Sequence, residues 1–160
     1  GCASDFTMGA DDTAMVISVA KIRSAALDIL TGREYSRQEL AQKLQRKFGH
    51  HSSIDEVLNG LQTDQLQSDR RYAEEFVRSR IQRGQGPIKI RADIGQKGIS
   101  NEILQLELNE QKIDWFSVVC DVSRRKYGVL GPQEQSDKAR RGRFFQSRGF
   151  TFEQISRVLK

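Results

Sequence analysis

A helix start recurs three times along the chain, at Ser53, Ser100 and Thr151. Each hydroxyl residue is followed by an acid two positions on and by apolar residues four and eight positions on, the spacing of a capped amphipathic helix. The matched positions are Asp55, Glu102 and Glu153, then Val57, Leu104 and Ile155, and last Leu61, Leu108 and Leu159. The copies begin roughly 50 residues apart, within the range of helical repeats. This pattern constrains the chain to fold as tandem copies of one helical unit.

Three helices fit into each copy. They are expected at Ala14 to Leu30, Arg37 to Phe48 and Ile54 to Leu66, then at Asp69 to Gly84, Pro87 to Gly98 and Asn101 to Gln111, and last at Trp115 to Tyr127, Glu134 to Arg148 and Phe152 to Lys160. Capping boxes are expected at Ser36/Glu39, Ser53/Glu56 and Thr151/Gln154. No segment shows the alternation of a strand. We therefore expect an all-α protein of three tandem three-helix repeats that form an elongated, curved body.

The repeats divide the chain into four parts. Residues 1–13 show no periodicity and are interpreted as a tail, flexible or vector-derived. Helical repeat 1 is expected over residues 14–67, repeat 2 over 68–112 and repeat 3 over 113–160.

The middle of the chain carries the clearest helix punctuation, between Asp69 and Ser100. Gly84 and Gly86 interrupt the helical spacing, and Pro87 follows where the first turn of a helix tolerates proline. The order of features here, DRRYA from Asp69 and then GQGPIKIRADIGQKGIS, closely resembles the RecX family of bacterial recombinase regulators. Looser similarity extends over nearly everything after Met15, through SRQELAQKL, RRKYG and FFQSRGF.

The resemblance implies both an architecture and a partner. RecX-like proteins are built from three-helix repeats, bind the RecA recombinase filament on DNA, and reduce its ATPase, strand-exchange and coprotease activities. We accordingly expect a regulator of DNA repair, homologous recombination and the SOS response, acting by groove bridging, end capping or both. The alternative is a helical protein that binds DNA without sequence specificity and acts without RecA. Weak binding to single- or double-stranded DNA fits either function.

Positive charge gathers in the later part of the chain. The formal net charge is +5, yet acids slightly outnumber bases before Ser68. Such an excess favours a polyanionic or acidic partner. The expected partner- or DNA-binding basic face comprises Arg71, Arg78, Arg80, Arg83, Lys89, Arg91, Lys97, Arg124, Arg125, Lys126, Arg140, Arg141 and Arg143. Lys138 and Arg148 belong to the same run of positive residues but are not among those chosen for the face. The competing interpretation is a solvated surface whose bases pair with nearby acids such as Glu74, Asp93 and Asp137.

Catalysis is not expected. The chain has no Cys/His nucleophile arrangement, no phosphate loop and no acidic metal cluster. The adjacent histidines, His50 and His51, are interpreted as structural or solvent-facing loop residues. We therefore predict a protein that is not an enzyme and that uses no metal or cofactor.

A helix, a glycine turn and a second helix between Pro87 and Glu110 superficially resemble a DNA-reading helix-turn-helix. The second helix carries Glu102, Glu107 and Glu110, whereas a helix entering the major groove should be basic or neutral, since phosphates flank it. We therefore do not expect it to read bases.

The remaining residue types set further limits. Cys2 and Cys120 indicate neither a disulfide framework nor a zinc site. No apolar run is long enough to cross a membrane and no secretory signal opens the chain, so we expect a cytoplasmic protein. We also expect a monomer, although no residue pattern determines the oligomeric state. The aromatic residues are assigned to core packing in preference to base stacking: Trp115, Phe116, Phe144, Phe145, Phe150 and Phe152.

Overall fold

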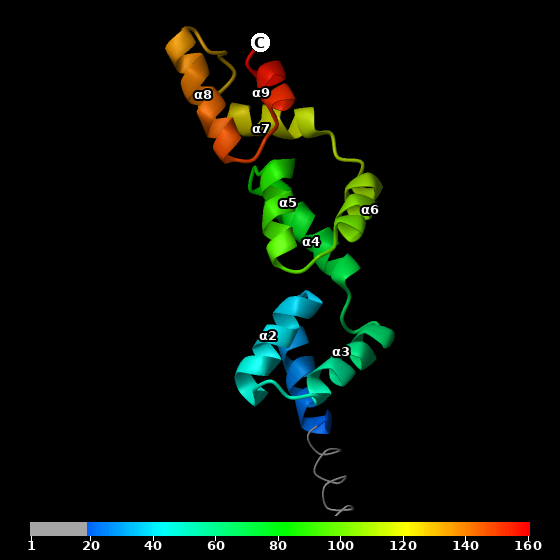
Figure 1. Cartoon of the computed structure of the whole chain (residues 1–160). Coiled ribbons are helices and arrows are strands. Elements are labelled where there is room, and N and C mark those ends of the chain that lie inside the picture. Colours follow the sequence, from blue (N-terminus) through cyan, green and yellow to red (C-terminus); the bar gives the residue numbers. More distant parts are fainter. Residues whose placement is uncertain (1–18) are drawn as a thin grey trace, which may run out of the picture. The chain divides into compact units, whose positions relative to one another are not determined.

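The computed structural model describes residues 19–160, and within that range the chain forms nine α-helices and no strand (Figure 1). A first helix covers residues 19–30. The others are α2 (Arg37–Phe48), α3 (Ser53–Thr63), α4 (Asp69–Gln82), α5 (Pro87–Gln96), α6 (Asn101–Gln111), α7 (Trp115–Tyr127), α8 (Gln135–Ser147) and α9 (Phe152–Val158). The predicted all-helical repeat fold is confirmed. The expected tail, Cys2 and the start of the first predicted helix lie outside the described residues.

Most of the predicted helix starts are confirmed. The Ser36 hydroxyl accepts a hydrogen bond from the Glu39 amide while the Glu39 side chain accepts from the Ser36 amide, and Thr151 with Gln154 forms the same box at α9. Ser100 caps α6 by accepting from the Ile103 amide at 3.2 Å. These caps satisfy amides that a helix start leaves without an internal partner.

The capping box predicted at Ser53 is wrong. Helix α3 begins at Ser53 itself, so the Ser53 hydroxyl points from inside the first turn and cannot reach back to cap it. The Ser53 amide donates instead to Nδ1 of His51 at 3.1 Å. The Ser53 hydroxyl is buried and has no hydrogen-bond partner among the described residues. The imidazole of His51 therefore has the structural role predicted for it.

The described chain divides into two compact units, one ending at Tyr72 and one beginning at Ala73, a division that falls inside α4. The core of the first unit gathers Ile22, Ala26, Leu40, Leu44, Ile54, Val57, Leu58 and Leu61. Buried Gln67 donates to the Tyr35 carbonyl at 3.2 Å and to Asp69 at 3.0 Å, and Asp69 accepts from the Arg37 amide at 2.8 Å. These bonds fix the segment that leads from α3 into α4.

In the second unit, repeats 2 and 3 are joined through two glycines. The Gly86 amide donates to the Arg148 carbonyl at 2.7 Å, and the Ile88 amide donates to the Gly149 carbonyl at 2.9 Å. A Cβ on Gly86 would lie 2.6 Å from the Gly149 carbonyl, and a Cβ on Gly149 would lie 2.6 Å from the Lys89 nitrogen. Gly149 also has φ +91°, a conformation that favours glycine. We call this contact the glycine joint.

Apolar burial in the second unit follows the repeat pattern. The predicted stripe residues Ile90 and Ile94 are buried in repeat 2, as are Phe145 and Phe150 in repeat 3. Phe152 departs from the prediction, because 86% of its surface is exposed. The first residue of α9 thus projects from the core that the other aromatic rings fill.

Candidate basic binding surface

Many of the bases predicted to form the basic face are bound to carboxylates within the fold. Arg78 bridges Glu74 at 2.7 Å and Glu75 at 3.1 Å. The other ion pairs are Arg71 with Glu34 in the first unit, Arg80 and Lys89 with Asp93, Arg124 with Asp121, and Arg140 and Arg141 with Asp137. Lys97 is half-buried and also interacts within the fold. The interpretation as a self-paired surface therefore accounts for these positions.

Arg141 does not lie on the exposed face where we expected it. Only 8% of its surface is accessible, its Nη1 donates to the Leu130 carbonyl at 3.0 Å, and its guanidinium lies 4.4 Å from the centre of the Tyr127 ring. Asp137 completes its surroundings at 3.3 Å. A hydrogen bond from Arg140 lowers the pKa of the Asp137 carboxyl, which keeps the carboxylate charged beside Arg141. Arg141 therefore fastens the α7–α8 connection to both helices.

Arg80 has a similar structural environment. Its Nη1 donates to Asp93 at 2.6 Å and to Gln85 at 2.9 Å, while its guanidinium lies 4.4 Å from the centre of the Phe76 ring. These contacts tie α4 to α5. Its charge is consequently engaged inside repeat 2.

The rest of the predicted face has a different environment. Within residues 19–160 these side chains form no ion pair with a carboxylate: Arg83, Arg91, Arg125, Lys126 and Arg143. All five are exposed. Their charge is available to a partner.

Three of these available cations meet in one hollow of about 210 Å³, where Arg83, Arg125 and Lys126 are joined by Arg148. We call this the basic hollow. Its floor consists of Gly84, Val122 and Phe144, and no carboxylate lies among the described residues that line it. Lys126 Nζ lies 5.1 Å and Arg148 Cζ 5.2 Å from the centre of the Phe144 ring. Cations and an aromatic floor thus share one small concavity.

The ends of three helices explain how the hollow forms. Arg83 follows the last residue of α4, Lys126 lies in the last turn of α7, and Arg148 is the C-cap of α8. Cations at helix C-termini complement the negative end of the dipole, so the cluster is tolerated without acidic partners. Arg148 was noted among the positive residues of repeat 3 but was not chosen for the predicted face. Its position four residues after Phe144 on one helix is the sequence signal that could have found it.

The arrangement is suited to binding anions. Exposed guanidinium and ammonium groups donate charge-assisted hydrogen bonds to phosphate or carboxylate oxygens. Such a contact is screened by salt, because the charges lie at the surface. The half-buried Phe144 ring adds an apolar surface beneath the charges.

Helix α6 presents the opposite charge. Glu102 and Glu110 are exposed, whereas Glu107 is 3% accessible and accepts from Gln111 Nε2 at 3.2 Å. One of the three glutamates on which we based the expectation that this helix does not read bases is therefore buried. The outward face of this helix still carries carboxylates.

Metal sites and membrane-spanning helices are two further possibilities for residues 19–160. No group of three or more His, Cys, Asp or Glu side chains in that range could hold a metal ion. No helix in it has the length and apolar character needed to span a membrane. Cys120 is a free thiol inside α7, and burial raises the pKa of that thiol.

Comparison with known proteins gives a consistent result. Models of the RecX family match the chain as the first three-helix domain over residues 23–61, the second over 68–106 and the third over 114–159. Regulatory protein RecX of Halorhodospira halophila is 37% identical over 134 residues, which cover 84% of this chain and 83% of that protein. The same-named protein of Chromohalobacter salexigens is 38% identical over 137 residues, covering 86% and 90%. The crystal structure of RecX from Lactobacillus salivarius has a similar fold, with a TM-score of 0.72 at 22% identity, covering 89% of this chain and 95% of that one.

Proposed function

Since this chain belongs to the RecX family of regulatory proteins, we propose that it regulates DNA repair and homologous recombination by binding the RecA nucleoprotein filament. In this role it lowers the filament's ATPase, strand-exchange and coprotease activities. It acts as a cytoplasmic monomer and performs no catalysis of its own. The relatives are named regulatory proteins, which supports a regulatory role.

The basic hollow is the observation that supports this proposal most directly. Arg83, Arg125, Lys126 and Arg148 converge with no carboxylate among the described lining residues. A nucleoprotein filament offers phosphates and acidic protein surface, both of which such a cluster binds. Long-range attraction between these charges and the filament speeds their encounter and weakens as salt rises.

Two physical routes lead from binding to inhibition. A chain that contacts neighbouring RecA protomers resists the changes between protomers that accompany ATP turnover. A chain bound at a growing filament end blocks the addition of the next protomer. End capping needs few molecules per filament, whereas bridging along the groove needs many.

RecA ATPase activity on single-stranded DNA, with this protein titrated at substoichiometric ratio, tests the proposal. We expect strong inhibition by the wild type. The triple variant Arg83→Glu, Arg125→Glu, Arg148→Glu should need a concentration at least about tenfold higher to reach the same inhibition of the ATPase. These side chains are exposed, so helical content by circular dichroism should not change.

A charge-matched control separates the hollow from net charge. The variant Lys21→Glu, Lys43→Glu, Arg46→Glu makes the same charge change at exposed positions of the first unit. We expect its inhibitory concentration to stay within about twofold of that of the wild type, because it loses only the long-range electrostatic attraction to the filament. Equal inhibition by the folded hollow variant and the wild type would remove the hollow from the mechanism.

The alternative function is DNA binding without RecA. The aromatic floor of the hollow favours it, since Phe144 lies beneath cations as in sites that bind single strands. Retention of labelled single-stranded DNA at increasing salt, with and without RecA, distinguishes the two functions. Tight retention by this protein alone, together with an unaffected RecA ATPase, would favour the alternative.

A further inference from the structure

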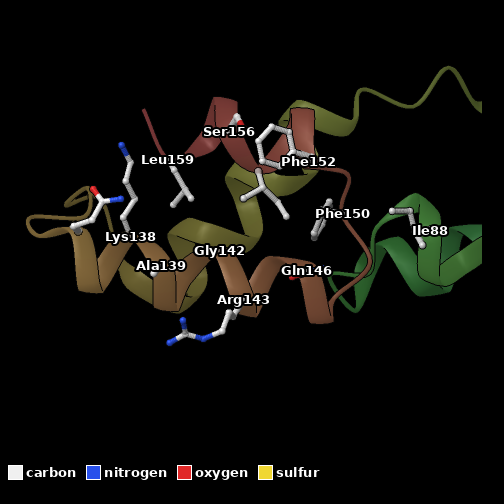
Figure 2. Close-up of a pocket in the computed structure, with 12 residues that line it drawn as sticks. Ile88, Lys138, Ala139, Gly142, Arg143, Gln146, Phe150, Phe152, Ser156 and Leu159 are labelled. Carbon is white, nitrogen blue, oxygen red and sulfur yellow. The ribbon is translucent and has the colours of Figure 1, made fainter.

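A second concavity, apart from the basic hollow, lies between α8 and α9. It has a volume of about 780 Å³, and Figure 2 shows it opening between these helices, with Lys138 near one end and Ile88 of α5 at the other. Its apolar lining comes from Ile88, Ala139, Phe150, Phe152, Ile155 and Leu159. We call it the α8–α9 groove.

The repeat pattern shows that part of a core is uncovered here. Leu61 in repeat 1 is 0% accessible, whereas its counterpart Leu159 in repeat 3 is only partly buried and lines the groove. Val57 and its counterpart Ile155 differ in the same way. Two further lining residues are strongly exposed, Ile88 at 56% and Phe152 at 86%. Two positions that repeat 1 buries thus contribute to an open apolar surface in repeat 3.

The charged residues that line the groove have one sign. Lys138 and Arg143 are both exposed on α8, no carboxylate is among the lining residues, and neither base has a carboxylate partner in the described part of the chain. From Lys138 to Gln146 the groove follows α8 for about 12 Å, which is two helical turns. An apolar trough of that length with basic edges matches an amphipathic helix with acidic flanks.

The two concavities use different faces of α8. Phe144 and Arg148 face the basic hollow, whereas Ala139, Gly142 and Gln146 face the groove. At Gly142 a Cβ would lie 3.7 Å from Leu159, so α9 packs closely along the groove floor. The groove can therefore be occupied while the hollow holds an anion.

We propose that the α8–α9 groove docks an acidic amphipathic helix of a protein partner. The helix presents apolar side chains at i, i+3 or i+4, and i+7 to Ile88, Phe152 and Leu159, and carboxylates to Lys138 and Arg143. A nucleic acid would leave the apolar floor without a partner. A second copy of this chain is disfavoured by the net charge of +5 that both molecules carry.

The probe is a displayed library of randomised 16-residue peptides, selected on the wild-type protein without RecA. We expect enriched sequences to combine the i, i+3 or i+4, i+7 apolar spacing with Asp and Glu. Their binding, measured with labelled peptide by fluorescence anisotropy, should weaken at least about tenfold in Phe152→Asp and in the double variant Lys138→Glu, Arg143→Glu. Leu106→Asp, at an exposed leucine of α6, is the matched control and should bind normally.

Several results would overturn the proposal. They are the absence of enriched peptides, enrichment of basic peptides, and enriched peptides that bind Phe152→Asp as tightly as the wild type. Self-association by analytical ultracentrifugation that Phe152→Asp abolishes would assign the groove to a second copy instead. Because RecA is absent from every arm, failure here leaves the proposed regulation of RecA standing. Conversely, a negative RecA ATPase titration leaves the groove measurement intact.

Discussion

Replacing Gly149 with alanine should destabilise the second unit by about 3–4 kcal/mol. A non-glycine residue held at φ +91° costs roughly 1–2 kcal/mol. The new Cβ would also lie 2.6 Å from the Lys89 nitrogen, so the backbones must separate. Separation loses the two joint hydrogen bonds, which contribute about 1 kcal/mol each.

Two further glycine variants divide this cost into its causes. Gly86 has φ −94°, so Gly86→Ala adds the clash with the Gly149 carbonyl without backbone strain, and we expect about 2 kcal/mol of destabilisation. Gly95 lies in α5 with no atom within 4 Å of an added Cβ. Gly95→Ala should therefore stabilise the protein by up to about 1 kcal/mol through helix propensity.

Urea denaturation followed by the fluorescence of Trp115 is the appropriate assay, since this single tryptophan lies in α7 of the second unit. Circular dichroism on the same samples reports total helix. We expect the urea concentration at the unfolding midpoint to be highest for Gly95→Ala, followed by the wild type, then Gly86→Ala, and lowest for Gly149→Ala. A Gly149→Ala midpoint equal to that of the wild type would show that close backbone approach does not hold repeats 2 and 3 together.

Two other substitutions and one chemical modification test separate features. Ser53→Ala should be neutral or stabilising by up to about 1 kcal/mol in thermal denaturation, because the hydroxyl is buried without a partner, whereas loss of a true cap would cost about 1 kcal/mol. Asp137→Asn should lower Tm at pH 7. The pKa of Asp137 is lowered in the folded state, so the carboxylate stabilises the fold fully above its unfolded pKa of about 4. This stabilisation is lost as pH falls through the still lower folded-state pKa. The difference in Tm between wild type and Asp137→Asn should therefore shrink toward about pH 2.5. Burial raises the pKa of Cys120, so in a Cys2→Ser background iodoacetamide should modify it more slowly than free cysteine at pH 8, and an equal rate would contradict its enclosure in α7.

Local signals made most helix boundaries predictable from the sequence. Ser100 and Thr151 cap the residues immediately after them, and Pro87 begins α5, because the hydrogen bonds involved span only a few residues. Ser53 failed for an equally local reason, since the neighbouring imidazole of His51 is a competing acceptor. An alignment of the three repeats takes no account of such an alternative acceptor beside one copy.

The candidate binding surface was less predictable, because it depends on which helix faces meet. Arg141 is buried through contacts with Tyr127 and Leu130, whose approach is set by the turn between two helices. Arg148 joins the basic hollow because α4, α7 and α8 end near one another. Phe152 is exposed because no described element covers the mouth of the groove. These arrangements cannot be deduced from the charge and hydrophobicity of the residues alone.

The glycine joint makes the association of repeats 2 and 3 visible to deuterium exchange. In an isolated α5 the Ile88 amide would lie in the first turn, where a helix provides no acceptor, and it would exchange freely with water. Here the carbonyl of Gly149 protects it, and Pro87 leaves no competing amide between Ile88 and Gly86. Hydrogen exchange at the Gly86 and Ile88 amides therefore measures how often repeats 2 and 3 separate, independently of fraying in either repeat. A partner that clamps the second unit would slow that exchange from a distance.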